Sequence, residues 1–220
     1  MKSTMTTIVC CLAGLLFFTS CSSKTDDYYP LKEGYTWTYN VNNGEKIQSV
    51  ENFEHRKLEK QKVIPQKIDV NGVTSFIFLA ENNKGIYQFA KQASDAIEPA
   101  ILEIPIYILK NPIKIGTTWQ KDSKTMLMME ELPVTLTYTI ESKKETVTVP
   151  AGTFENCLKV KAEASIEKDK GFLGVITVTI THYDWYAPNV GLIKSVKTES
   201  GNHMLTPVRE SIVQLESFKK

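Results

Sequence analysis

The chain has 220 residues, with 26 basic and 25 acidic side chains and a formal net charge of +1. This balance gives no reason to expect a nucleic acid or an anionic membrane surface as a partner. The length is enough for one sizeable hydrophobic core, or at most two small ones.

The N-terminus has the layout of an export signal. An apolar run of 11 residues, Ile8 to Phe18, follows the positive charge of Lys2. It is shorter than the roughly 20 residues that cross a bilayer as a helix, and small residues follow it. The alternative is a buried core helix, which would lie at the extreme N-terminus without any capping pattern.

The residues that close this run, Phe18-Thr19-Ser20-Cys21, resemble the cleavage box of a bacterial lipoprotein. The resemblance implies that residues 1–20 are removed and that the Cys21 thiol carries lipid. Residues 21–28 would then be the lipidated cysteine and its tether, and residues 29–220 a single β-rich domain. Phe18 stands where the family prefers Leu, so ordinary signal-peptidase cleavage is the alternative. The resemblance also implies three acyl chains at the new N-terminus. Three chains would make attachment to the membrane effectively permanent, since a single acyl chain binds a bilayer only marginally.

The residues after Cys21 indicate the membrane to which the protein would be anchored. Ser22 follows the cysteine, whereas Asp at that place would resemble an inner-membrane retention signal. Lys24-Thr25-Asp26-Asp27 resembles the acidic tether that sends some lipoproteins to the outer face, although a charged tether is expected in any case. We therefore expect an envelope protein anchored to the outer membrane, on its periplasmic or its outer face.

Cysteine usage excludes an intrachain disulfide in the processed chain. Cys10 and Cys11 leave with the signal, Cys21 is consumed by lipid, and Cys157 remains alone. Alternation along its strand places Cys157 on the charged side, opposite Phe154. No local feature lowers the pKa of its thiol, so an inert thiol is favoured over a reactive or pairing one.

The first half of the chain predicts hairpins. Asn43-Gly44 and Asn71-Gly72 each separate β-branched or aromatic stretches, and Asn-Gly there favours a type I′ turn. Residues 35–41 should therefore pair with the stretch from Lys46, and residues 63–70 with residues 73–80. Pro99 and Pro105 break any long helix over residues 93–109, which predicts a short helix or loop followed by an irregular strand.

The second half predicts longer strands. Residues 134–140 alternate between apolar residues and threonine, the period of a half-buried strand. Turns at residues 169–171, 187–189 and 201–202 separate three more strands and give an antiparallel meander. Strands of 12 or more residues favour a strongly twisted sheet. The predicted fold class is thus mainly β, a long-stranded antiparallel meander forming a curved sheet or open half-barrel with at most one short helix.

The sequence contains one internal echo. Pro30 to Trp37 matches Pro112 to Trp119 at a spacing of 82, and in both a tryptophan follows a glycine by three residues. A convenient way to enter a strand explains the match, and a duplicated half-domain is the alternative.

Three segments together resemble a family of exported bacterial proteins of unknown function, many of them lipoproteins. They are Tyr29 to Tyr39, Val149 to Phe154 and Trp185 to Lys194. Those proteins are similar to the half-barrel class of lipoprotein carriers, in which a curved antiparallel sheet wraps an apolar concave face. The resemblance carries no catalytic residues to transfer.

A search for chemistry finds no catalytic or metal-binding motif. The three histidines, His55, His182 and His203, lack zinc-ligand spacing, so no metal or cofactor is expected. His182 and Asp184 should point to the same side of a strand, as a hydrogen-bonded pair rather than a catalytic one. Glu130 and Glu131 are adjacent, so on a strand they face opposite ways.

The aromatic residues leave one alternative open. Trp37, Trp119 and Trp185 are expected in the core, but exposed tryptophans would form a platform for stacking sugars. Met126 to Met129 form a soft apolar cluster, either a mobile flap over a cavity or the start of a strand.

These observations lead to one expected function and one alternative. We expect a non-catalytic envelope lipoprotein, anchored to the membrane through Cys21, that binds an apolar or amphipathic ligand or a partner protein. The alternative is a carbohydrate-binding or polysaccharide-associated surface module. No ligand-binding residues could be named from the sequence.

Overall fold

The computed structural model describes residues 28–204, 206 and 208–220. The predicted signal peptide and Cys21 lie outside the described residues. Within these, the secondary structure consists of β-strands and two 3-10 turns, η1 (Asn42–Gly44) and η2 (Gly171–Leu173). No described helix is long and apolar enough to span a membrane. The strands are β1 (Thr36–Val41), β2 (Lys46–Asn52), β3 (Arg56–Leu58), β4 (Gln61–Val70), β5 (Val73–Asn82), β6 (Gly85–Gln92), β7 (Ala100–Lys110), β8 (Thr118–Leu127), β9 (Glu130–Val149), β10 (Gly152–Asp169), β11 (Val175–Ala187), β12 (Gly191–Gly201) and β13 (Arg209–Lys219).

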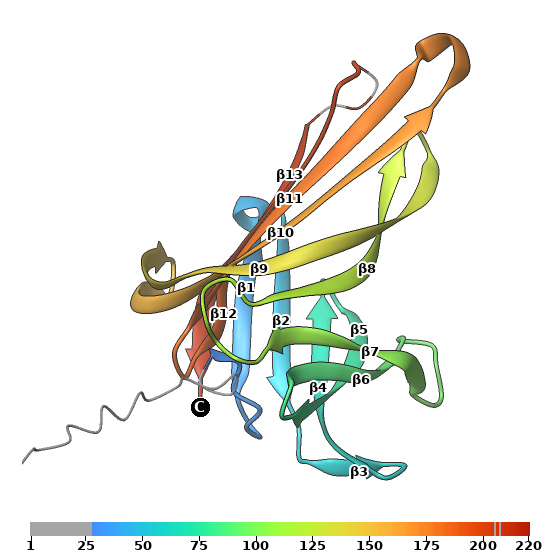
Figure 1. The fold of residues 1–220 in the computed structure, drawn as a ribbon. Coiled ribbons are helices and arrows are strands. Elements are labelled where there is room, and N and C mark those ends of the chain that lie inside the picture. Colours follow the sequence, from blue (N-terminus) through green and yellow to red (C-terminus); the bar gives the residue numbers. More distant parts are fainter. Residues whose placement is uncertain (1–27, 205, 207) are drawn as a thin grey trace, which may run out of the picture.

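The strands form one antiparallel sheet in the order β7-β6-β5-β4-β2-β1-β13-β12-β11-β10-β9-β8, with β3 paired to β4 beside this path. The sheet curls until its end strands, β7 and β8, approach each other and leave one seam in a nearly closed barrel (Figure 1). The predicted fold class, a curved antiparallel meander of long strands, is confirmed.

The predicted hairpins form, with one difference in turn geometry. Val70 pairs with Val73, and Asn71 and Gly72 between them both have positive φ, as a type I′ turn requires. Val41 pairs with Lys46, so the first connection has four residues rather than two. Asn42, Asn43 and Gly44 all have positive φ there.

The Pro-containing segment is a loop followed by an irregular strand. β6 ends at Gln92 and β7 begins at Ala100, with no helical turn over the residues between them. The register of β7 against β6 shifts twice, and the pairing skips from Ile101 to Ile106. Pro105 lies in the skipped stretch, where a missing N–H donor costs no ladder hydrogen bond.

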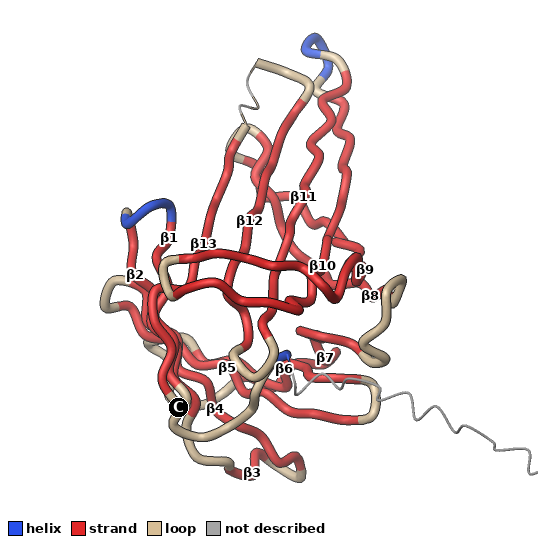
Figure 2. Tube along the Cα trace, turned by 90° about the vertical axis from the view of Figure 1, so that its left-hand side faces the viewer, coloured by secondary structure: helices blue, strands red, loops and turns tan. Residues whose placement is uncertain are grey.

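β9 and β10 form a hairpin of 20 and 18 residues that bends near its end. The turn reaches across to β13, where Ala151 N donates to Leu215 O at 3.0 Å (Figure 2). The bend coincides with three register shifts between Phe154 and Val160, and Asn156 has a φ of +54°. A bulge of this kind increases twist and breaks the alternation of side chains.

The predicted position of Cys157 is wrong because of this bulge. Cys157 and Leu158 are consecutive, yet both are fully buried. Leu158 packs in the cluster of β8 to β11, and Cys157 packs with Trp37 and Leu215. The prediction counted alternate residues from Phe154, and the extra residue of the bulge near Asn156 breaks that count. Cys157 therefore faces the core and not the charged side.

The internal echo has a structural counterpart. Gly34 and Gly116 both have positive φ, and each donates its N–H at 2.9 Å, to Asn52 O and Ile140 O respectively. The same two partners donate back to the residue after each glycine, at 2.9 and 3.0 Å. Trp37 and Trp119 then begin β1 and β8 as buried side chains in different clusters. The echo is thus one shared way of entering a strand.

Three hydrophobic clusters support the sheet. The largest joins β8 to β11 with Tyr28, and alternate residues of β9 supply five of its members, Leu132, Val134, Leu136, Tyr138 and Ile140. The second joins β1, β12 and β13 to the bent end of the β9–β10 hairpin. The third lies on β4, β5 and β6 and contains Val63, Phe78, Ala80, Tyr87 and Ala90. Each is formed by residues that alternate along neighbouring strands, as half-buried strands require.

Candidate functional site

His182 and Asp184 lie on the same side of β11, as the sequence predicts. His182 Nε2 is 3.0 Å from Asp184 Oδ1 and 2.7 Å from Ser195 Oγ on β12. Both partners therefore contact the same ring nitrogen. A hydrolytic triad needs the carboxylate on one nitrogen and the hydroxyl on the other, because the carboxylate orients the ring while the second nitrogen takes the hydroxyl proton and passes it to the leaving group. This arrangement holds the imidazole in place and offers no such relay.

Asp184 is the centre of a buried polar group. Its side chain accepts a hydrogen bond from the Tyr186 hydroxyl at 3.4 Å, and only 8% of the residue is exposed. Burial raises the pKa of Tyr29 to about 12 and raises the pKa of Tyr138 further, with the Asp184 charge acting in the same direction. Burial lowers the pKa of Lys121, and Asp184 opposes that shift. Asp184 thus lies among buried tyrosines and Lys121, and its charge contributes to the pKa shift of each.

The segment that follows the predicted tether is fixed to the sheet by buried amides. Asn52 Nδ2 donates to the carbonyls of Pro30 and Lys32, at 3.2 and 3.1 Å. Tyr29 Oη donates to Gln66 Oε1 at 3.0 Å. The first described residues are therefore held against β2 and β4.

The tryptophans do not form a common platform. Trp37 and Trp119 are each only 4% exposed, and Trp37 Nε1 donates to Val190 O at 2.6 Å. Trp185 is half-buried on the other side of β11 from Asp184. Its ring lies 5.9 Å from Tyr183, with the ammonium groups of Lys159 and Lys194 at 5.9 and 5.4 Å from its centroid.

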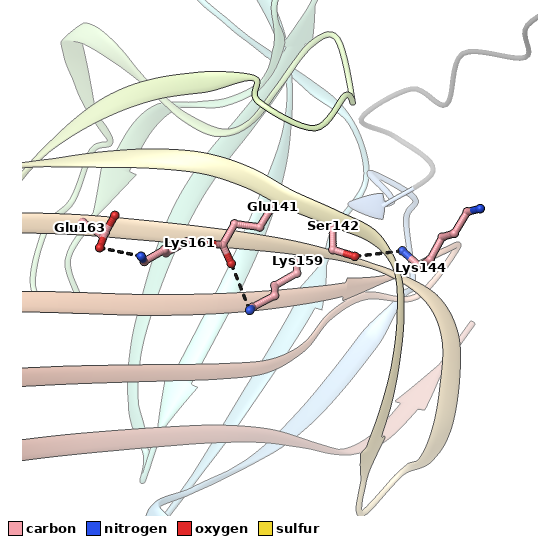
Figure 3. Close-up of polar contacts among 6 residues, drawn as sticks. All are labelled: Glu141, Ser142, Lys144, Lys159, Lys161 and Glu163. Carbon is pink, nitrogen blue, oxygen red and sulfur yellow. Dashed lines mark hydrogen bonds and ion pairs between the residues drawn. The ribbon is translucent and has the colours of Figure 1, made fainter.

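Lysines around Trp185 are paired with carboxylates. Lys159 Nζ lies 3.1 Å from Glu141 Oε2, and Lys161 Nζ lies 2.7 Å from Glu163 Oε1 (Figure 3). The Lys159 ammonium is also 4.6 Å from the Tyr183 ring centroid. The protein's own ammonium groups thus already lie against the Tyr183 and Trp185 rings.

The methionine cluster is a hairpin turn. Met126 and Leu127 end β8, and Met128 and Met129 connect it to β9 with φ of +52° and +80°. Glu130 and Glu131 follow and bind different lysines, Glu130 those of β10 and its turn and Glu131 Lys124 of β8. The segment is therefore the end of one strand and the turn into the next.

A cleft of about 390 Å³ opens beside β3, and we call it the aromatic cleft. Phe53 is 40% exposed, and its ring meets Phe76 edge to face at 6.0 Å. The Arg56 guanidinium lies 4.7 Å from the Phe78 ring centroid. Phe53 and Phe76 thus present apolar surface above the buried Phe78 and Pro65, with charged groups beside it. Its lining consists of Phe53, Glu54, His55, Arg56, Pro65, Phe76, Phe78 and Gln92.

A second cleft of about 410 Å³, the polar cleft, lies next to the fixed N-terminal segment. His55 lines both clefts. The polar cleft carries the cations Lys32 and Lys62 and the acid Glu81. Its lining consists of Pro30, Leu31, Lys32, Tyr35, His55, Gln61, Lys62, Ile64, Leu79, Ala80, Glu81 and Asn189. The aromatic cleft supplies apolar surface and the polar cleft supplies cations, and the two lie next to each other at His55.

Sequence reasoning missed these clefts. Phe53 to His55 connect β2 to β3, which begins at Arg56, and Phe76 and Phe78 come from β5, two positions from β2 in the sheet. The pairing of Phe78 with Pro65 and the hydrogen bond from Phe53 N to Pro65 O bring the two parts together. The one available signal was the run of cations from Arg56 to Lys62, interrupted by few acids. Among the described residues, no group of three or more His, Cys, Asp or Glu side chains could hold a metal ion.

Comparison with one solved structure supports the fold, and a second is more distantly similar. A candidate lipoprotein from Parabacteroides distasonis aligns over 90% of this chain and 100% of its own, with a TM-score of 0.50 and 18% sequence identity. A candidate exported protein with a YmcC-like fold from Bacteroides fragilis aligns over 88% of this chain and 99% of its own, with a TM-score of 0.46 and 19% identity. No curated protein matches the chain significantly.

A family model described as DUF3108-like matches residues 81–206, which is more than half of the chain. The match runs from the end of β5 to the β12–β13 connection and so includes the long-stranded half of the barrel. The chain therefore belongs to the DUF3108-like family.

Proposed function

We propose that this protein is a non-catalytic, membrane-tethered envelope lipoprotein that binds an amphipathic ligand in the aromatic cleft. The observation that carries the proposal is the cleft itself, about 390 Å³ with three phenylalanines and a proline in its lining. Ligand sites are commonly concave, 300–1,000 Å³ in volume and mostly apolar, with a few polar groups that orient the ligand.

The physical basis of binding is the burial of apolar surface. Phe53 is exposed by 40% although it lies against Phe76, so the free protein leaves aromatic surface in water. Covering apolar surface is worth about 25 cal/mol per Å², and an acyl chain is a ligand that can cover it. His55, Arg56 and Gln92 would orient a polar end of that ligand.

The lack of a proton relay at His182 supports a non-catalytic role. Ser195 and Asp184 share one ring nitrogen, and the buried tyrosines around Asp184 have raised pKa values that keep them neutral. Neither group lines the aromatic cleft. Binding, rather than reaction, is the activity that the cleft supports.

The membrane tether remains part of the proposal. The box at Cys21 predicts a lipid anchor, and the polar cleft includes Pro30 to Lys32, only nine residues further along the chain. The solved proteins that resemble this fold are described as a lipoprotein and an exported protein, which agrees with this address. A ligand leaving the membrane surface would meet the clefts at the tethered end of the molecule.

The test uses the processed chain from residue 21 with Cys21→Ser, which keeps every described residue. Titration with N-phenyl-1-naphthylamine, a neutral apolar fluorophore, should give saturable enhancement of its fluorescence. Phe53→Ala with Phe76→Ala should weaken binding at least about tenfold, because two of the three rings are removed. Phe172→Ala is the matched control, since Phe172 is 96% exposed in η2. Equal binding by both variants would refute the cleft as the site.

The carbohydrate-binding alternative rests on Tyr183 and Trp185, which lie side by side on one face of β11. Lys159 and Lys194 cover these rings, so a sugar would have to displace an ammonium group before stacking. Trp185→Ala would weaken retention on immobilised envelope polysaccharide if this alternative holds. Unchanged retention would remove it.

A further inference from the structure

We infer that the ligand of the aromatic cleft is an anionic amphiphile, whose phosphate or carboxylate head is held by Arg56 and attracted at longer range by the lysines of the β3–β4 hairpin. This inference rests on the proposed function and specifies the chemistry of its ligand. It comes from the charges that surround the cleft, which differ from those of the rest of the protein.

The β3–β4 hairpin concentrates positive charge. Residues 54–62 contain four cations, Arg56, Lys57, Lys60 and Lys62, and two acids, Glu54 and Glu59. Lys32 adds another cation across the polar cleft from Lys62. The chain as a whole is nearly neutral, so this charge is local rather than general.

The cations also face one another. Lys57 and Lys62 are direct partners in the β3–β4 ladder, so their side chains project to the same side of the sheet. Like charges at directly opposite positions destabilise a pair of strands. A negative charge bound at Arg56 would lower the cost of this repulsion through its attraction for both lysines.

No carboxylate neutralises these lysines. In the part of the chain that the structure describes, no acid lies within ion-pair distance of Lys57, Lys60 or Lys62. Several lysines of the other half do pair with glutamates, as Lys159 and Lys161 do in Figure 3. The hairpin thus holds a group of neighbouring lysines without an ion-pair partner among the described residues.

Arg56 connects this charge to the aromatic cleft. Its guanidinium lies over Phe78, at 4.7 Å from the ring centroid, and its planar fork can donate two parallel hydrogen bonds to a carboxylate or phosphate. Leu58 packs against the same cluster as Phe78, which places Arg56 and Leu58 on the apolar side of β3. Lys57 and its ladder partner Lys62 therefore project from the other side of the hairpin, and their charges act on the head group at longer range. An anionic head at Arg56 would leave its chain lying over Phe53 and Phe76.

The experiment compares dodecyl phosphate with dodecyl maltoside, each below its critical micelle concentration, by calorimetric titration of the processed chain. Dodecyl phosphate should bind at least about tenfold more tightly, because hydrogen bonds to charged groups are the stronger ones. The triple variant R56Q, K57Q and K62Q should lose that preference and keep the affinity for dodecyl maltoside. The double variant K159Q and K161Q is the control, since it removes charges that are already paired.

Flotation with phosphatidylglycerol vesicles and with phosphatidylcholine vesicles distinguishes the source of the head group. Flotation with the anionic vesicles alone, lost in the triple variant, would support the inference with a bilayer lipid as the source. Binding of dissolved dodecyl phosphate, lost in the same variant, would support it with a free amphiphile as the source. Equal binding of both dodecyl compounds would overturn the inference and leave the proposed function standing. Failure of every amphiphile to bind would overturn both.

Discussion

Gln66 and Asn52 are joined by a buried hydrogen bond in which Gln66 Nε2 donates to Asn52 Oδ1 at 2.9 Å. Both residues are almost fully buried, at 3% and 1% exposure. Asn52 in turn holds the carbonyls of Pro30 and Lys32, so this one pair of amides fastens the N-terminal segment to the sheet. The wall of the polar cleft depends on it.

Replacing Asn52 by Leu should therefore destabilise the fold. The change leaves the Gln66 amide and two backbone carbonyls without their partner, and an unsatisfied buried group costs about 1–3 kcal/mol. We expect the free energy of unfolding in urea to fall by about 3 kcal/mol. Asn83→Ala, at an exposed turn, should change it by less than about 0.5 kcal/mol. A similar small effect for both variants would contradict the role of the pair.

Gly85 should tolerate no side chain. A Cβ at this position would lie 2.2 Å from the carbonyl oxygen of Leu109, and φ is +135°. Gly85→Ala should therefore cost several kcal/mol, since both the backbone strain and the clash on β7 must be relieved. Gly72→Ala is the matched control, because Gly72 has a φ of +87° with open space around it. Thermal unfolding of the two variants at equal midpoints would show that the contact between β6 and β7 is looser than described.

The Cys157 thiol should be inert in the native protein. Burial, with the nearby Glu145 charge, raises its pKa to about 11. At pH 8 only about one thiol in a thousand would be ionised, and the thiolate is the reactive form. Labelling by a chromogenic disulfide reagent should be slow in buffer and fast in 6 M guanidinium chloride. A Cys157-linked dimer on non-reducing electrophoresis of the processed chain would contradict this prediction.

Alkaline pH should unfold the barrel through its tyrosines. Burial raises the pKa of Tyr29 to about 12 and raises those of Tyr39, Tyr138 and Tyr186 as well, above the ordinary value of 10. A folded-state pKa above the unfolded one stabilises the fold at low pH, and this contribution is lost as pH rises from about 10 through the folded-state value. Absorbance at 295 nm and circular dichroism should therefore change together above pH 10 for these tyrosines. Ionisation of all nine tyrosines near pH 10 with native dichroism would exclude their burial.

Most strands and hairpins could be predicted from the sequence, because the patterns that specify them are local. Strand alternation and Asn-Gly turns are local properties, and the pairing of Val70 with Val73 follows from two residues between them. The alternation of β9 likewise reports directly on which face is buried. Local patterns of this kind could be read without knowing how the sheet closes.

The clefts and the bulge could not be predicted in the same way. The position of Cys157 depends on one extra residue near Asn156, and nothing in the residue types marks it before the register is known. The aromatic cleft depends on Phe53 reaching Phe76 across two intervening strands of chain. Such sites arise from pairing between distant segments, which composition and periodicity do not specify.

The central claim is that the aromatic cleft binds an amphiphile, and anomalous diffraction tests it most directly. Crystals of the processed chain soaked in 11-bromoundecanoate carry a bromine at the far end of the acyl chain. We expect a bromine peak in contact with Phe53 or Phe76, and no such peak in crystals of the Phe53→Ala, Phe76→Ala variant. A peak elsewhere on the barrel, or none at a ligand concentration that saturates binding in solution, would contradict the account.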